Sequence, residues 1–242
     1  YAAFLMILFT YRMETAFFRF GNQDVDLEKA FSTASISLLV STVIFLGIGI
    51  LVSPTLADFL NFPDREIYLI SLLFIIAFDA LSAIPFARLR LENRPIKFAV
   101  AKTLAIVINI ITVYFFLDWL PELIENGYTN LSFLYHAEQR VIYVFISNLI
   151  GSAAVFFYLI PAYFKMQWQF DRALWQRMAW YVLPLIVVGI AAVINSLIAN
   201  PLLESWLPGT IEENKQVVGV FSATAKLAVL MNLFTQAFNY AA

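Results

Sequence analysis

The chain has 242 residues, of which 62% are apolar and only 13% are charged, and Phe alone contributes 24. This composition is typical of an integral membrane protein, because a soluble protein needs many more charged residues to cover its surface. The formal net charge of −2 provides no basic excess for binding nucleic acid.

Residues that carry soluble-type catalysis are scarce. The chain has no Cys, which excludes disulfides, thiolate metal sites and a Cys nucleophile. Its single histidine, His136, stands in a polar segment near acidic residues, where such a side chain is more often solvated than bound to a metal. The sequence contains no Gly-rich phosphate loop, Ser-His-Asp set or HExxH motif. We therefore expect no enzyme activity, no cofactor and no metal site.

Long apolar runs dominate the chain. A helix needs about 20 apolar residues to cross a bilayer core of about 30 Å. Runs of this kind predict seven transmembrane helices, at residues 1–20, 35–53, 67–86, 98–117, 140–164, 179–199 and 217–240. They are about twice as long as barrel strands and lack strict alternation, so they favour an all-α, polytopic membrane fold. Because the chain opens and stops in mid-pattern, we expect it to be a fragment of a longer protein.

Lys and Arg residues divide unevenly between alternate connections. One set holds Arg65, Arg140 and Lys215 only. The other set holds nine cations: Arg19, Lys29, Arg88, Arg90, Arg94, Lys97, Lys165, Arg172 and Arg177. The positive-inside rule places the nine in the cytoplasm, so the first span runs from outside to inside.

A short internal echo relates the two ends of the chain. LMILFT at residues 5–10 recurs as LMNLFT at residues 230–235. The first and seventh spans would then be equivalent elements separated by six helices. An even separation preserves direction across the membrane, which predicts a parallel repeat and two bundles that face each other across a cleft.

Four ionisable residues lie deep inside expected spans, whereas Arg19 and Lys102 stand near span ends and can reach the interface. The four are Arg12 and Glu14 in the first, Asp79 in the third and Lys226 in the seventh. Each costs about 2.5 to 3.5 kcal/mol at the bilayer centre on insertion scales. Arg12 lies about 13 Å from the cytoplasmic turn, and on a continuous helix Glu14 points about 200° away from it, so each needs its own partner or water.

Two interpretations of these four residues remain open. In the first, the four residues form ion pairs that hold helices together. In the second, they line a water-filled cavity, and the cations Arg12 and Lys226 would suit a phosphorylated substrate. Polar candidates for a secondary lining are Ser222, Asn195 and Asn232. Hydrogen bonding between helices is the ordinary role of such Asn residues.

Three stretches resemble a known family: RLRLENRPIKFAVAKT, PLIVVGIAAVIN and GVFSATAKLAVLMNLFTQAFNYAA. They are similar to bacterial polysaccharide-biosynthesis membrane proteins, the Wzx-like lipid-linked oligosaccharide flippases of the multidrug/oligosaccharidyl-lipid/polysaccharide (MOP, MATE-like) exporter superfamily. The likeness covers nearly the whole chain, with loose motifs. Related sequences often carry an Asp-Arg pair where Ala199 and Asn200 stand here, so no ion or gate role of that pair is transferred.

The resemblance implies a fold of twelve to fourteen helices in two six-helix lobes around a central cavity. Residues 1–164 would be the N-terminal lobe (helices two to six, with the first helix missing), 165–178 a cytoplasmic linker, and 179–242 the start of the C-terminal lobe (helices seven and eight). It also implies that Arg12 and Lys226 belong to a cationic cavity lining.

The implied function is alternating-access export of undecaprenyl-pyrophosphate-linked oligosaccharide across the bacterial inner membrane, for O-antigen, capsule or exopolysaccharide. Partners would be membrane lipids, the lipid-linked substrate and other polysaccharide-assembly proteins, with no nucleic acid and with H⁺ or Na⁺ as a possible coupling ion.

Three alternatives remain. On the same fold, a cation-coupled MATE-type drug exporter would use Glu14 and Asp79 to bind protons or sodium. A membrane-embedded glycan polymerase or ligase needs a large external loop of catalytic residues, and the longest outside loop, 118–139, is short. A noncatalytic assembly subunit would show buried charge pairs without a cavity.

Overall fold

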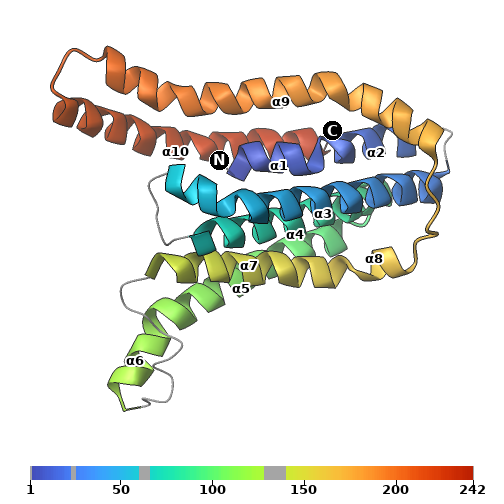
Figure 1. Ribbon diagram of the computed structural model, residues 1–242, viewed down its shortest axis with the longest axis horizontal. Coiled ribbons are helices and arrows are strands. Elements are labelled where there is room, and N and C mark those ends of the chain that lie inside the picture. The colour runs from blue at the N-terminus through green and yellow to red at the C-terminus, as the bar shows by residue number, and fades with distance from the viewer. Residues whose placement is uncertain (1, 23–25, 60–65, 128–139, 242) are drawn as a thin grey trace. The chain divides into compact units, whose positions relative to one another are not determined.

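The computed structural model of the chain describes residues 2–22, 26–59, 66–127 and 140–241. All regular structure in these ranges is helical, and no strand occurs in them. The all-α fold expected from the long apolar runs is therefore confirmed for the described part of the chain (Figure 1). His136 and most of the loop expected at 118–139 lie outside the described residues.

The helices follow the expected spans, with short helices at several ends. In chain order they are α1 (Ala2–Thr10), α2 (Met13–Gly21), α3 (Leu27–Phe59), α4 (Glu66–Leu91), α5 (Pro95–Tyr114), the π-helical turn η1 (Phe115–Trp119), α6 (Leu120–Glu125), α7 (Arg140–Leu159), α8 (Pro161–Phe164), α9 (Arg172–Trp206) and α10 (Ile211–Ala241).

Five helical segments of the described residues are long and apolar enough to cross a membrane. They are Leu27–Ala57, Glu66–Leu91, Pro95–Glu125, Arg140–Phe164 and Arg172–Asn195. The chain is therefore a multi-pass membrane protein by length and composition. The expected count of seven is not confirmed: the first span is divided into α1 and α2, each of 9 residues, and the span expected within α10 is not among the five.

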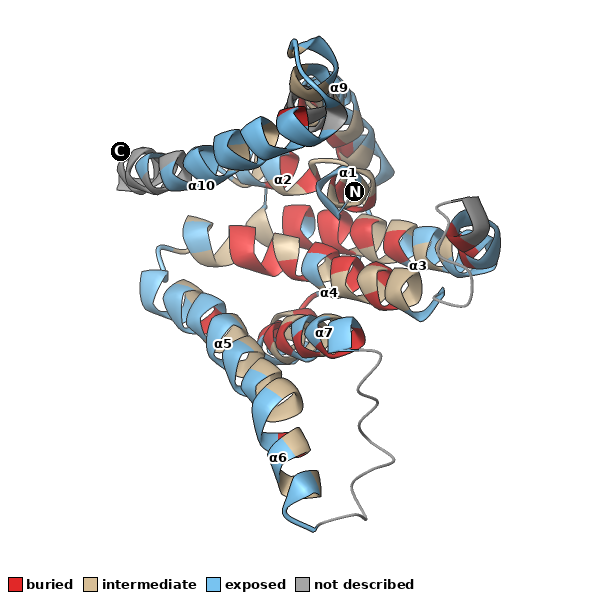
Figure 2. Cartoon of the chain, turned by 90° about the vertical axis from the view of Figure 1, so that its left-hand side faces the viewer, coloured by how far each residue is buried: buried red, intermediate tan, exposed pale blue. Residues whose placement is uncertain are grey.

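The chain divides into two compact units, residues 1–187 and 188–242, which are described separately. In the first unit α4 is central and contacts α1, α2, α3, α5 and α7. Figure 1 shows α3, α4 and α7 side by side, and Figure 2 shows that many buried residues lie on these three helices, whereas α5 is largely exposed. The exposed residues of α5 include the apolar Ile106 and Ile110, as a surface in contact with lipid requires.

Small residues allow the central helices of the first unit to approach closely. Ala30 and Ala34 of α3 are fully buried beside the large side chains of Phe17 and Phe31. On α7, a Cβ atom added to Gly151 would lie 3.2 Å from the carbonyl oxygen of Ala105 on α5. The α5–α7 contact therefore depends on the missing side chain at position 151, a common device in membrane helices.

The segment expected as a linker, residues 165–178, becomes helical at Arg172, where α9 begins. Leu174 and Met178 of this segment are buried in the same cluster as Phe17 and Phe31. The start of α9 therefore belongs to the packing of the first unit, and the boundary between compact units falls after Val187. The assignment of residues to two transporter lobes stays a prediction.

The second unit contains the end of α9, a turn and α10. Thr210 and Glu213 form a capping box at the start of α10: the Thr210 amide donates to Glu213 Oε2 at 2.9 Å, and the Glu213 amide donates to Thr210 Oγ1 at 3.4 Å. The bonds that the Thr210 amide and hydroxyl donate to Glu213 Oε2 lower the pKa of Glu213. Asn214 Nδ2 donates to the carbonyl oxygens of Glu204 and Leu207, at 3.1 and 2.9 Å, and so ties the two helices together.

The internal echo does not extend to backbone shape. Tyr11 and Arg12 interrupt the first span between α1 and α2, whereas α10 continues through the corresponding residues, 236 and 237. The backbone of the first span therefore differs from that of α10 at the position where the first span carries Arg12.

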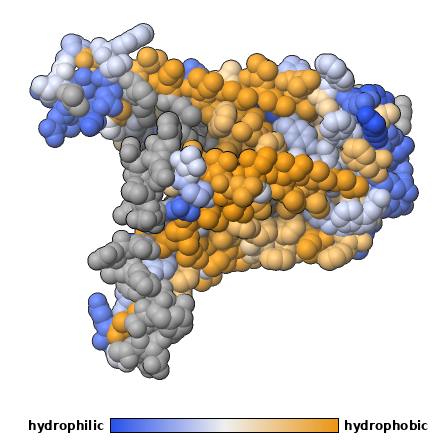
Figure 3. Space-filling model, viewed as in Figure 1, coloured by the Kyte–Doolittle hydropathy of each residue, from blue (hydrophilic) through white to orange (hydrophobic). Residues whose placement is uncertain are grey.

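One end of the first unit gathers cations. Arg88 near the end of α4 pairs with Glu28 at the start of α3, and Lys29 pairs with Asp171 just before α9. Figure 3 shows hydrophobic residues along the helices and hydrophilic residues at the right-hand end, where Figure 1 places these termini. We call this end the basic end. It holds the helix termini that carry the nine cations of the larger set of Lys and Arg residues, from Arg19 to Arg177. That it faces the cytoplasm stays a prediction.

Candidate functional site

The first expected span is interrupted at Tyr11 and Arg12. Both residues have left-handed backbone torsions, with φ of 34° and 58°. The Thr10 hydroxyl donates to the carbonyl oxygen of Met6 at 2.8 Å, a bond that loosens helices. The helical pattern then restarts where the Thr15 amide donates to the Arg12 carbonyl oxygen at 3.0 Å. The chain therefore places a new helix start inside an apolar segment.

This break is costly for a membrane protein. A left-handed residue other than Gly costs roughly 1 to 2 kcal/mol, and neither Tyr11 nor Arg12 is Gly. A helix start also leaves amide groups without intrahelical acceptors. Inside a bilayer such groups are tolerated where protein surrounds them or where they line a water-filled cavity. Conformations of this kind cluster at functional sites.

Two other helices hold the break in place. The Tyr11 hydroxyl and Ser37 Oγ of α3 are 2.5 Å apart, and the Trp175 indole Nε1 of α9 donates to the same Ser37 oxygen at 2.6 Å. Because an indole nitrogen only donates, Ser37 accepts from Trp175. A single hydroxyl therefore connects the interrupted span to α3 and α9.

An apolar pocket adjoins this junction. Its volume is about 710 Å³, and its lining includes Tyr11, Ser37 and Trp175. Most of the remaining lining is aliphatic or aromatic, contributed by α1 and α3 through residues such as Ile7, Ile44 and Phe45. The pocket belongs wholly to the first unit. It offers an apolar ligand a cavity within the range typical of small-molecule sites, about 300 to 1,000 Å³.

The regular helix expected to carry both Arg12 and Glu14 is interrupted at Arg12. The expectation that they point about 200° apart assumed regular helical geometry, and Arg12 instead precedes α2 in a left-handed conformation. The positive charges of Arg12 and Arg90 both act on Glu14. Glu14 Oε2 is nevertheless buried and accepts no hydrogen bond from the described residues. The carboxylate thus keeps one acceptor atom free beside two cations.

Asp79 lies in a different environment. Its neighbours are Ser152 of α7 and the positive charge of Lys102 of α5. The Lys102 ammonium itself lies 4.3 Å from the centre of the Phe86 ring. Among the described contacts, none joins Asp79 to Arg12 or Glu14. The charge of Arg12 therefore acts on Glu14, whereas Asp79 lies on the side of α4 that meets α5 and α7.

The other expected site residues belong to the second unit, which is described by itself. Lys226 is exposed on α10, and Asn195 is exposed on α9. Ser222 is half-buried and has an interaction partner. The side chain of Asn232 lies outside the described residues. Grouping these residues with Arg12 in one cavity remains a prediction.

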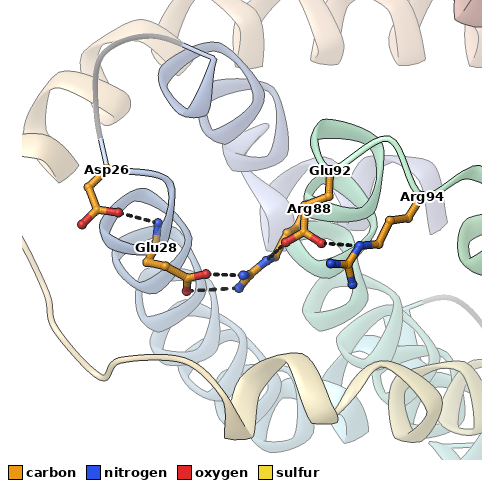
Figure 4. Close-up of polar contacts among 5 residues, drawn as sticks. All are labelled: Asp26, Glu28, Arg88, Glu92 and Arg94. Carbon is orange, nitrogen blue, oxygen red and sulfur yellow. Dashed lines mark hydrogen bonds and ion pairs between the residues drawn. The ribbon is translucent and has the colours of Figure 1, made fainter.

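An ion-pair network occupies the basic end, close to the start of α3 (Figure 4). Arg88 binds Glu28 on α3 and donates from Nε to Glu92 Oε1 at 2.5 Å. Glu92 Oε2 in turn accepts from Arg94 Nε at 2.9 Å. Arg88 also lies over the Phe31 ring, 4.5 Å from its centre. These contacts join the start of α3, the end of α4 and the start of α5.

Sequence reasoning missed the polar stripe on α3 that holds α9. Ser32 Oγ accepts from the Gln169 amide at 2.9 Å, and Thr33 Oγ1 accepts from the Asp171 amide at 3.2 Å. Asp171 caps α9 by accepting from the Leu174 amide at 3.0 Å. Its ion pair with Lys29, at 2.7 Å, and this cap lower the pKa of Asp171 to about 2. The signal in the sequence was the hydroxyl-rich stretch FSTASIS, residues 31–37.

In the described ranges, no group of three or more His, Cys, Asp or Glu residues is arranged to hold a metal ion. No protein-family model, curated protein or solved structure matches this chain.

Proposed function

We propose that this chain is part of a membrane transporter that moves a lipid-linked, pyrophosphate-bearing oligosaccharide across the bacterial inner membrane by alternating access. In this proposal Arg12 and Lys226 bind the pyrophosphate, and the polyprenyl chain stays in apolar surroundings. The chain has no catalytic role, and movement of two helical lobes carries the substrate across.

The interrupted helix at Tyr11 and Arg12 is the observation that carries the proposal. In many transporters, substrate and ion sites form where transmembrane helices are discontinuous, with the start of a half-helix directed at an anionic group. Here the start of α2 coincides with an arginine. An arginine fork and a positive helix end both favour phosphate oxygens.

The adjoining pocket supports a lipid-linked substrate. Its lining is mainly apolar, and Tyr11 belongs both to the pocket and to the break. A ligand with a charged head and a hydrocarbon chain therefore finds both environments within one region of the first unit. The resemblance of RLRLENRPIKFAVAKT and the two other stretches to Wzx-like flippases agrees with this chemistry.

A cation-coupled exporter of amphiphilic drugs is the second candidate. The free, buried Glu14 Oε2 favours it, because a carboxylate of this kind can take up a proton or bind a sodium ion. The two candidates differ in what Arg12 does: it binds substrate in the flippase and only balances Glu14 in the drug exporter.

The proposal is tested in a bacterial strain that depends on this chain for surface glycan. Arg12 and Lys226 are replaced separately by Gln, and Arg177→Gln serves as the control because Arg177 is an exposed cation at the basic end. The flippase predicts loss of surface glycan and accumulation of lipid-linked precursor in R12Q and K226Q, with normal export in R177Q.

Membrane expression of each variant is measured in parallel by immunoblotting. Normal export in both R12Q and K226Q, at normal protein levels, would contradict the assigned roles. Retained glycan export together with lost drug resistance in Glu14→Gln would favour the second candidate.

A further inference from the structure

A second pocket lies at the basic end, away from the interrupted helix. Its volume is about 430 Å³, and the end of α4, the start of α5 and the α7–α8 junction line it. Its polar lining comprises Arg88, Glu92, Arg94, Lys97, Tyr158 and Lys165. Lys165 is far from the other charged residues in sequence, so folding brings cations from separate elements to one concave surface.

The charge of this pocket is strongly positive. Four cations face a single carboxylate, Glu92, in its lining. Glu28 neutralises part of this excess because it pairs with Arg88. The start of α5, at Pro95, adds the positive end of a 20-residue helix to the same region. The pocket therefore suits an anion.

The ion pairs orient the pocket and leave donors free. Glu92 holds Arg94 through the Nε atom alone, as Figure 4 shows, so both terminal nitrogens of that guanidinium remain available. Lys97 and Lys165 are exposed, and neither has a carboxylate partner in the described part of the chain. Three cationic groups can thus donate to one ligand, and a phosphate group accepts several such bonds at once.

The pocket also has an apolar part. Leu89 and Leu159 contribute to its lining. Tyr158 and the basic groups lie near helix ends, the level at which a membrane protein meets lipid headgroups. A ligand with a phosphate beside hydrocarbon fits this combination better than a free phosphate ion does. Basic pockets between transmembrane helices are a recognised setting for anionic lipid headgroups.

We propose that this pocket binds the phosphate headgroup of an anionic phospholipid from the adjacent leaflet. Arg94, Lys97 and Lys165 contact the phosphate, and Glu92 is a positioning residue that holds Arg94. This site is separate from the proposed transport site and requires no transported substrate.

Native mass spectrometry of the purified full chain tests the proposal. The protein is released from detergent micelles that contain equal amounts of phosphatidylglycerol and phosphatidylcholine with the same acyl chains, and the ratio of the two bound lipids is measured. A basic residue near an anionic surface contributes about fivefold in affinity. The Lys97→Gln/Lys165→Gln double variant is therefore expected to lower the phosphatidylglycerol preference by about 5- to 30-fold.

The matched control is Arg19→Gln/Arg177→Gln, which removes the same charge at the basic end from exposed residues that line neither this pocket nor the apolar pocket at the helix break. It is expected to leave the ratio within about twofold of the original. Lys97→Arg/Lys165→Arg retains the charge and is expected to retain the preference. The lysines are exposed, so the variants should fold, and thermal unfolding in phosphatidylcholine alone verifies this.

Two results would overturn the proposal. Equal losses of preference in the Lys97/Lys165 and Arg19/Arg177 variants would show a general effect of charge rather than a pocket. An affinity of the pocket for inorganic phosphate equal to its affinity for phosphatidylglycerol would show that the pocket takes free phosphate and has no need of the lipid.

Discussion

The variants Arg12→Gly and Arg12→Ala should differ in stability, and the sign of the difference shows whether the helix is interrupted at position 12. Both Arg12→Gly and Arg12→Ala remove the guanidinium group and its interaction with Glu14, so that loss cancels in the comparison. What remains is the backbone. At φ 58° and ψ 22°, position 12 is in the left-handed region, which costs Ala roughly 1 to 2 kcal/mol and Gly almost nothing.

The expected difference follows from two opposing effects. With Gly at position 12 the unfolded chain has more conformational freedom than with Ala. This lowers the stability of the Gly variant, relative to the Ala variant, by about 0.4 to 1 kcal/mol. After this is subtracted, Arg12→Gly should be more stable than Arg12→Ala by up to about 1.6 kcal/mol, and by about 0.8 kcal/mol at the midpoints of the two ranges. In a continuous helix the sign reverses, and Gly is less stable than Ala by about 1 kcal/mol.

Phe18 provides the matched control because it is exposed in the middle of α2. There, Phe18→Ala should be more stable than Phe18→Gly by about 1 kcal/mol. The assay is unfolding of the purified full chain in detergent, followed by far-ultraviolet circular dichroism. At about 2 to 4 °C per kcal/mol for a chain of this size, the pair at position 12 should differ by about 1 to 4 °C in Tm. Arg12→Ala melting above Arg12→Gly would refute the break.

The remaining predictions concern the contacts that position the site. Arg88→Ala should lower the free energy of unfolding by about 1 to 2 kcal/mol in the same assay, since Glu28 loses its partner and Glu92 keeps only Arg94; a loss no larger than that of the exposed Arg177→Ala would contradict this. Gly151→Val should cost about 1 to 3 kcal/mol because it forces α5 from α7, whereas Gly47→Val, which meets nothing within 4 Å, should change stability by less than about 0.5 kcal/mol. Asp171 has a pKa of about 2 against an ordinary 3.8, so its stabilising effect is complete above pH 4 and is lost as the pH falls towards 2. The unfolding temperature should therefore fall more steeply over this interval in the original chain than in Asp171→Asn, and equal slopes would count against the Lys29 pair.

Hydrophobicity was enough to locate the helices. The runs at 67–86 and 140–164 correspond to α4 and to α7 with α8 within a few residues, because a membrane helix must satisfy its backbone internally and keep an apolar surface over its whole length. The uneven distribution of Lys and Arg likewise anticipated an end rich in cations.

The break at Tyr11 and Arg12 could not be read from the same pattern. It contains neither Gly nor Pro, the residues that mark a helix interruption in sequence. Its shape depends on Ser37 and Trp175. Ser37 is 26 residues from Tyr11 in the sequence, and Trp175 is 138 residues from Ser37. Two apolar half-helices and one continuous helix have the same composition, so only tertiary contacts distinguish them.

The candidate site was anticipated in part. Arg12 and Glu14 were recognisable because charge is rare in apolar spans, but the regular helix from which their mutual orientation was derived does not include Arg12. Asp79 was chosen by the same criterion, and its described neighbours, Ser152 and Lys102, lie on α7 and α5. Intramembrane charge therefore identifies candidates, and packing decides which of them meet.

Access of water to position 12 is the most direct test of the central claim that the interrupted helix forms part of a transport site. The chain contains no Cys, so Arg12→Cys would carry the only thiol in it. The full chain is embedded in membrane vesicles of both orientations and treated with a charged, water-soluble methanethiosulfonate reagent. Ile110→Cys, at an exposed apolar position of α5, is the lipid-facing control. We predict that the thiol at position 12 is modified in at least one orientation while that at position 110 reacts only after denaturation. A thiol at position 12 as unreactive as the one at position 110 would contradict the account.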